Sequence, residues 1–145
     1  MGILSYPILH YDRIAAILNS HLQNLTVDFL VSIGYNGFMK ELKILTLKNN
    51  KRPLDLWIDS LDNSMQYRIL DRLSRLQEGY YGDFKMIDSE IKELRLKFGS
   101  GYRIYFHETK DTIILLLCGG DKSTQSKDIK KAKEYLNLWK EQQNG

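Results

Sequence analysis

Two neighbouring segments of this chain alternate apolar residues with residues that can bind phosphate. The segments are "ELRLKF" (93–98) and "YRIYFH" (102–107), separated by "GSG". Successive side chains of a β-strand point to opposite faces, and a short glycine turn pairs the two strands. The polar side chains on the shared face are Arg95, Lys97, Arg103, Tyr105 and His107. We expect them to lie together on a water-exposed side of a sheet.

Such a set suits the cleavage of a phosphodiester. Arginine and lysine bind phosphate and stabilise the charge that builds on phosphorus in the transition state. A tyrosine, a histidine or a lysine of lowered pKa could accept the proton of a 2′-hydroxyl or protonate the leaving 5′-oxygen. Tyr105 could also stack on a base. The alternative is that this face is simply the solvated side of an antiparallel sheet, which is a common arrangement.

A loop after the most apolar segment adds one more cation to this edge. The run "IILLLCGG" (113–120) ends in two glycines, and Lys122 follows. We interpret the glycines as backbone freedom at a strand end and Cys118 as a core residue. The lysines of "KDIKKAK" (127–133) are typical of a solubility face.

A second group of cations has helical spacing. Arg68, Arg72 and Arg75 follow one another at intervals of four and three residues, so they line one face of a helix. That face could rest on RNA or on an acidic partner, or it could be solvated. The chain contains no pattern typical of a zinc site, a phosphate-binding P-loop or a nucleophile triad.

The elements that position these residues can be predicted from periodicity. Strands are expected at "KELKILTLK" (40–48), "FKMI" (84–87), "EIKELRLKF" (90–98), "YRIYFHE" (102–108) and "DTIILLLC" (111–118). Helices are expected at about 11–24, after Pro53, at about 64–78 with a cap at Asp62 or Asn63, and from a cap near Ser126 to the end. This order predicts an α+β fold: a small antiparallel sheet of four to five strands, two preceding helices on one face, and a C-terminal helix.

Length and composition are those of one ordinary globular domain with an arm. The chain has 145 residues, 43% of them hydrophobic and 27% charged, with a net charge of +3 and one cysteine. We divide it into an N-terminal extension, 1–38, which could be dispensable or follow from a misplaced start, and a domain, 39–145. The absence of a disulfide framework, of a secretory signal and of a long apolar stretch predicts a cytoplasmic protein without membrane contact.

At the level of motifs the chain resembles a known family. The segments "WIDSLDN", "RILDRLSRLQEGYYGDFK", "ELRLKFGSGYRIYF" and "IILLLCGGDKSTQSKDIKKAKEY" resemble the RelE/ParE superfamily of bacterial toxins, and most closely its HigB-like addiction-module killer branch. The resemblance extends from about Met39 to Trp139. It implies a toxin of a type II toxin-antitoxin system that works as an mRNA interferase, an endoribonuclease that cuts mRNA on the ribosome and needs neither a metal nor another cofactor.

The resemblance also implies roles for individual residues and partners. Arg103 would contact the phosphate in the transition state, Tyr105 would stack or transfer a proton, and Lys122 would bind phosphate. The resemblance adds Arg95, counted among the catalytic group, and Lys97 and Lys85 as positions that hold RNA. From the spacing and alternation described above, His107, Arg68, Arg72 and Arg75 are further candidates for RNA binding. The expected partners are the ribosome, mRNA and a helix-turn-helix antitoxin. Two alternatives stay open: a non-enzymatic, ParE-like inhibitor of DNA gyrase, and an inactive partner of the antitoxin.

Overall fold

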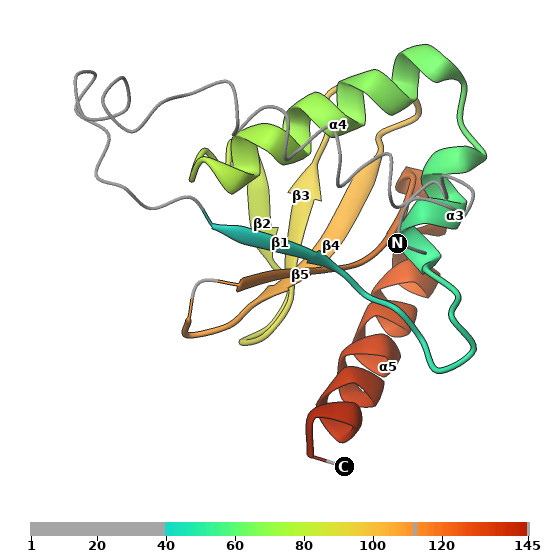
Figure 1. The fold of residues 1–145 in the computed structure, drawn as a ribbon. Coiled ribbons are helices and arrows are strands. Elements are labelled where there is room, and N and C mark those ends of the chain that lie inside the picture. Colours follow the sequence, from blue (N-terminus) through green and yellow to red (C-terminus); the bar gives the residue numbers. More distant parts are fainter. Residues whose placement is uncertain (1–39, 112, 145) are drawn as a thin grey trace, which may run out of the picture. The chain divides into compact units, whose positions relative to one another are not determined.

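Five strands form one sheet in the order β1-β5-β4-β3-β2 (Figure 1). We describe it from a computed structural model, which covers residues 40–111 and 113–144. The strands are β1 (Glu41–Ile44), β2 (Phe84–Met86), β3 (Lys92–Arg95), β4 (Arg103–Glu108) and β5 (Ile113–Gly120). The expected helix at 11–24 and the expected arm at 1–38 lie outside the described residues.

The predicted α+β class is confirmed, with one difference in strand direction. The pairs β2–β3, β3–β4 and β4–β5 are antiparallel, as short turns require. By contrast, β1 runs parallel to β5, with Leu42 opposite Ile114 and Ile44 opposite Leu116. The sheet is therefore mixed, because its first and last strands, which are far apart in sequence, lie side by side.

The helices cover both sides of the sheet. They are α3 (Pro53–Asp59), α4 (Asn63–Gln77), the short 3₁₀ turn η2 (Lys122–Thr124) and α5 (Gln125–Asn144). Helices α3 and α4 lie on one side, as predicted, and α5 lies on the other (Figure 1). The side of the sheet that carries Tyr105 is consequently not open to water along its whole length.

Local sequence accounts for the helix ends. Pro53 occupies the first turn of α3. The side chain of Asp62 accepts a hydrogen bond from the backbone N–H of Met65 at 2.9 Å, which confirms the predicted cap of α4. The predicted start near Ser126 is correct to within one residue, because α5 begins at Gln125. Asp121 caps η2 in a capping box with Thr124, and α5 continues directly from that turn.

Gly119 and Gly120 identify which helix packs on which face. A side chain on Gly119 would overlap the ring of Trp57 in α3, and one on Gly120 would overlap the carboxylate of Asp128 in α5. The predicted position of this pair at a strand end is correct, since Gly119 and Gly120 are the last two residues of β5, but the predicted need for backbone freedom is wrong. Neither glycine has a positive φ, and the missing side chains give room to close neighbours.

Strand register then divides the core into two layers. Leu94 and Ile104 are in register with Gly119, so they face α3 and α4. Glu93, Tyr105 and Cys118 are in register with one another on the face of α5. The buried layer under α5 consists of Leu45, Ile91, Tyr105, Leu115, Leu117, Cys118, Ala132 and Leu136. The register skips one residue of β5 between Tyr105 and Phe106. Both aromatic side chains are buried, on opposite faces of the sheet, because helices cover both faces.

Candidate nucleic-acid interface

The side chain of Glu93 is the centre of a polar cluster on the α5 face of the sheet. It is fully buried. Its Oε1 lies 3.0 Å from Nε of Arg95 and 3.6 Å from Nε of Arg103. Its Oε2 accepts hydrogen bonds from the hydroxyl of Tyr105 at 3.0 Å and from Nε2 of Gln125 at 2.8 Å. One carboxylate thus fixes two arginines of neighbouring strands.

The electrostatics of this cluster favour the charged form of Glu93. Burial raises the pKa of the carboxyl, but the hydrogen bonds from Gln125, Arg95 and Tyr105 and the charge of Arg103 outweigh it and lower the pKa below the ordinary value. Two guanidinium groups against one carboxylate leave a local excess of positive charge. The side chains of Arg95 and Arg103 are 37% and 14% exposed, so part of this charge faces solvent.

Lys122 joins the two arginines across the glycine turn that precedes β4. At Gly101, which has φ 75°, a Cβ atom would lie 3.2 Å from Cβ of Lys122 and 3.3 Å from Nη1 of Arg103. Nη1 of Arg103 also donates to the carbonyl of Gly101 at 2.7 Å, and the amide of Lys122 donates to the carbonyl of Ser100 at 3.3 Å. The structure therefore brings together three of the predicted residues, which we call the cationic triad: Arg95, Arg103 and Lys122.

The predicted exposure of Tyr105 is wrong. Its side chain is completely buried beneath α5, and its hydroxyl is used by Glu93. Burial, the charge of Glu93 and this hydrogen bond raise the pKa of Tyr105 far above the usual value. Tyr105 can neither stack on a base nor exchange a proton with a substrate in this conformation, and it is a structural ligand of Glu93.

His107 lies apart from the cationic triad although it occupies the same face of β4. Its Nδ1 lies 2.7 Å from the carbonyl oxygen of Glu90, and its ring contacts that of Trp139. β4 carries Arg103 at its first residue and His107 near its last. The shared face was predicted correctly, but the length of the strand separates the two ends.

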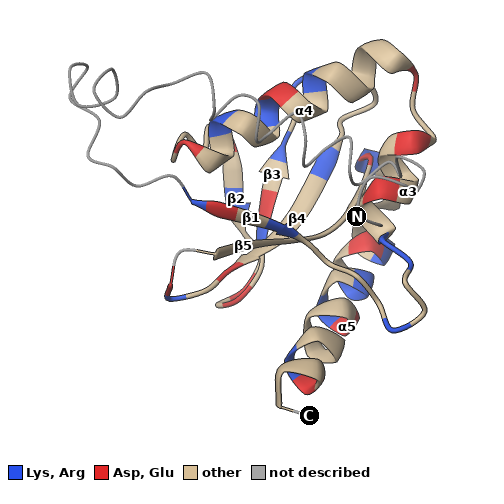
Figure 2. Cartoon of the chain, in the orientation of Figure 1, with Lys and Arg blue, Asp and Glu red and all other residues tan. Residues whose placement is uncertain are grey.

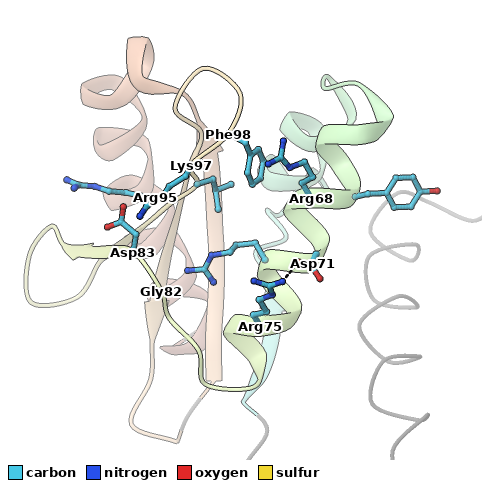
Figure 3. Close-up of a pocket in the computed structure, with 11 residues that line it drawn as sticks. Arg68, Asp71, Arg75, Gly82, Asp83, Arg95, Lys97 and Phe98 are labelled. Atoms are coloured by element: carbon cyan, nitrogen blue, oxygen red, sulfur yellow. Dashed lines mark ion pairs between the residues drawn. The ribbon is translucent and has the colours of Figure 1, made fainter.

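The arginines of α4 line a cleft of about 530 Å³ against the end of β3 (Figure 3). The guanidinium of Arg68 lies over the ring of Phe98, 4.3 Å from its centroid. Arg75 pairs with Asp71 at 3.2 Å. Arg72 donates to the carbonyls of Tyr80 and Tyr81, and burial lowers its pKa. Arg72 therefore holds the chain after α4 in place and is less available to a ligand than the predicted three-arginine patch assumed.

Lys97 and Arg95 connect this cleft to the cationic triad. Both residues line the cleft, but Figure 3 shows the side chain of Arg95 pointing away from α4. Lys97 is exposed, as is Lys85, which stands opposite Glu93 in the register of β2 with β3. Figure 2 shows further cations along α5. The basic side chains of the described residues are thus spread over more than one face of the domain.

Sequence reasoning missed Glu93 and Gln125, the two residues that organise the cationic triad. Glu93 is the single acidic residue in the polar alternation of "ELRLKF", and an acid between cations on one strand face is a recognisable signal for an ion pair. Gln125 carries no comparable signal, since only the packing of α5 brings it to Glu93. The described residues contain no group of His, Cys, Asp and Glu arranged to hold a metal ion. None of the described helices combines the length and apolarity needed to span a bilayer.

Two comparisons with known proteins bear on this domain. A family model described as "Phage derived protein Gp49-like (DUF891)" matches residues 56–137. A protein of Haemophilus influenzae, described as uncharacterized, is 48% identical over 80 residues, which are 54% of this chain and 81% of that protein. The matched range of the family model includes Glu93, Gln125 and all three members of the cationic triad.

Proposed function

Because this chain belongs to the phage-derived Gp49-like family, we propose that it is the toxin of a type II toxin-antitoxin system, of the RelE/ParE and HigB-like kind. In this proposal it is a metal-independent endoribonuclease that cuts mRNA on the ribosome in the cytoplasm. Its partners would be a helix-turn-helix antitoxin, the ribosome and mRNA. We propose residues 39–145 as the toxin domain and residues 1–38 as an arm that activity does not require.

The observation that supports nuclease chemistry most directly is the cationic triad. Cleavage by the 2′-hydroxyl forms a bond from O2′ to phosphorus and breaks the bond to the 5′-oxygen, leaving a 2′,3′-cyclic phosphate and a free 5′-hydroxyl. The phosphorane-like transition state carries more negative charge on its non-bridging oxygens than the substrate does. Arg103 and Lys122 can oppose that charge, while Arg95 holds the strand.

The cationic triad and its neighbours Glu93 and Tyr105 offer no available group for proton transfer. The pKa of Glu93 is lowered and its oxygens are already engaged, while Tyr105 is buried. A protein that supplies charge stabilisation without an exposed base near the reacting oxygen is expected to be slow on free RNA. We propose that the ribosome aligns the 2′-hydroxyl with the phosphate, which supplies the missing contribution through orientation.

Arg103→Ala tests the proposal in cells and in extracts. Induction of the wild-type chain should stop growth and fragment mRNA within minutes, whereas Arg103→Ala should not. Lys130→Ala, on the exposed side of α5, is the matched control and should behave like the wild type. Unchanged cleavage by Arg103→Ala would contradict the role of this residue. Growth arrest with intact mRNA and an SOS response would instead assign the protein to the gyrase inhibitors.

A further inference from the structure

The cleft between α4 and the end of β3 has a construction that the cleavage site does not need. It is separated from the exposed ends of Arg103 and Lys122 by β3, on whose opposite face these residues lie. Its volume of about 530 Å³ falls within the range of about 300–1,000 Å³ that small-molecule sites occupy. It is therefore large enough for a nucleotide, and it borders the proposed cleavage site, because Arg95 of the cationic triad also lines it.

A stacking platform forms one wall of the cleft. Arg68 lies over Phe98 at 4.3 Å from the ring centroid, and Phe98 in turn packs edge-to-face on Tyr102 at 6.0 Å. The aromatic ring covers one side of the planar guanidinium. The other side is free to stack on a second flat π-system, since Arg68 is exposed. Nucleobases that have left a helical stack are recognised in this way on arginine planes.

The charges around the platform suit a phosphate. The basic residues of the lining are Arg68, Arg72, Arg75, Arg95 and Lys97, and the acidic ones are Asp71 and Asp83. Asp71 is paired with Arg75 at the exposed surface, where such an ion pair is weak and can be exchanged for a phosphate. The net charge of the lining stays positive even when Arg72 is assigned to the backbone carbonyls that it binds.

We propose that this cleft binds one unpaired nucleotide of single-stranded RNA, with its base on the guanidinium of Arg68 and its phosphate at Arg75. The stacking and charge argue for a single-stranded nucleic acid, and the choice of RNA rests on the proposed function. An aliphatic protein segment fits less well, because most of the lining is charged and its aliphatic residue, Leu96, is only 4% exposed. The ring of Tyr67, which is 70% exposed in the same lining, offers a further stacking surface for a base. In this arrangement the cleft holds RNA next to the cleavage site and contributes to the choice of sequence.

Binding of a labelled RNA nonamer, followed by fluorescence anisotropy with the full chain, tests the proposal. Arg68→Ala should weaken binding of the single strand about tenfold, the loss expected when one base loses its stacking partner. Arg68→Lys, which keeps the charge and removes the plane, should lose nearly as much. Arg75→Ala should lower the salt dependence of the single-strand affinity by about 0.7 in slope. Lys130→Ala is the control and should bind as the wild type does.

Each other outcome has a defined meaning. Full binding by Arg68→Lys with loss in Arg68→Ala would show a charge contact alone and overturn the stacking site. Equal losses for a duplex of the same sequence would also overturn it, because a paired base cannot enter the cleft. Equal affinity for a single-stranded DNA nonamer of the same sequence would keep the nucleotide site and remove the preference for RNA. If Arg68→Ala, Arg68→Lys and Arg75→Ala all bind RNA as the wild type does, the nucleotide site is overturned. Protection of the cleft from hydrogen exchange by a co-expressed protein would then assign the cleft to a protein interface.

The cleavage proposal can fail separately. Arg103→Ala should retain binding of the nonamer while cleavage on the ribosome is lost. If Arg68→Ala lowers binding but no variant or wild-type chain cleaves mRNA, the nucleotide site stands and the nuclease assignment does not. If Arg103→Ala abolishes cleavage while the cleft variants bind RNA normally, the nuclease assignment stands and the nucleotide site in the cleft does not.

Discussion

The hydroxyl of Tyr105 donates a hydrogen bond to Oε2 of Glu93 at 3.0 Å, and both side chains are fully buried under α5. A tyrosine of β4 and a glutamate of β3 that stand opposite one another in the register thus form the inner part of the cluster whose outer part is cationic. This relationship assigns Tyr105 to the support of the site and leaves the contact with substrate to its neighbours.

Tyr105→Phe should lower stability and leave toxicity intact. The change removes one donor from a buried carboxylate and keeps the ring, so the free energy of unfolding should fall by about 1–3 kcal/mol. Urea denaturation measures this loss, and growth after induction measures toxicity. Tyr135→Phe is the control, because Tyr135 packs on the same layer and its hydroxyl has no hydrogen-bond partner among the described residues. Lost toxicity at unchanged stability would restore a chemical role to Tyr105.

Glu93→Gln should impair the site more than the fold. The substitution keeps the size of the side chain but removes the charge that Arg95 and Arg103 share. The arginines are partly exposed, so we expect a loss of about 2 kcal/mol in stability, below the cost of stranding a fully buried charge. Cleavage of ribosome-bound mRNA, measured well below the melting temperature, should fall at least about tenfold because the guanidinium groups lose their fixed orientation.

The control for this substitution is Glu90→Gln, which changes an exposed glutamate that pairs with Lys140. It should affect neither quantity measurably, as is typical of surface ion pairs. If Glu93→Gln were to lose stability and keep full activity, the carboxylate would serve only the fold.

Gly119→Ala should destabilise the domain by about 1–3 kcal/mol through overpacking. The added methyl group would overlap ring carbons of Trp57, which packs on this glycine from α3. In the Trp57→Leu background the same change should cost clearly less, and a double-mutant cycle measures the difference. Equal costs in both backgrounds would mean that the methyl group is accommodated by a movement of the strand.

Alternation and periodicity predicted most of the fold because they report directly on burial. Arg95 and Arg103 were correctly placed on one side of two paired strands, and the stripe of α4 became core. Lys97 lies beyond the end of β3 and lines the cleft at α4 instead. The same patterns could not show that α5 returns over the face that carries Arg95 and Arg103. Ala132 and Leu136 indicate that the C-terminal helix has an apolar face, but they do not indicate which side of the sheet that face covers. Tyr105 was assigned to solvent for this reason.

Only the part of the site that strand pairing brings together could be predicted from the sequence. Arg95 and Arg103 are direct partners in the β3–β4 register, and the glycine turn beside them fixes Lys122. The cleft at α4 depends on a contact between Arg68 and Phe98, which are 30 residues apart in the sequence. Whether these two side chains meet depends on the path of the loops that connect α4 to β3. No local pattern encodes such a contact, so the two basic groups were treated as separate surfaces.

A second carboxylate, the partly buried Glu108 in β4, connects several segments near the end of the sheet that lies away from the cationic triad. It accepts hydrogen bonds from Lys40 at 2.5 Å, from Lys92 at 3.1 Å and from the hydroxyl of Tyr81. Burial by itself raises the pKa of Glu108, but the hydrogen bonds from Lys40, Tyr81 and Lys92 together lower it from 4.5 to about 2. The residues come from before β1, before β2, from β3 and from β4, so this one carboxylate ties together four parts of the chain.

Glu108→Gln should remove an acid-dependent part of the stability. A carboxyl whose pKa is lower in the folded state stabilises the fold above its unfolded pKa, and this contribution disappears as the pH falls from about 4.5 to about 2. The shift corresponds to roughly 3 kcal/mol near neutral pH. Urea denaturation at several pH values should therefore show a large deficit of Glu108→Gln at about pH 7 that shrinks toward pH 2. Glu41→Gln, at an exposed position, should follow the wild type throughout, and a deficit of Glu108→Gln that stayed constant over this pH range would mean that the charge of Glu108 does not stabilise the fold.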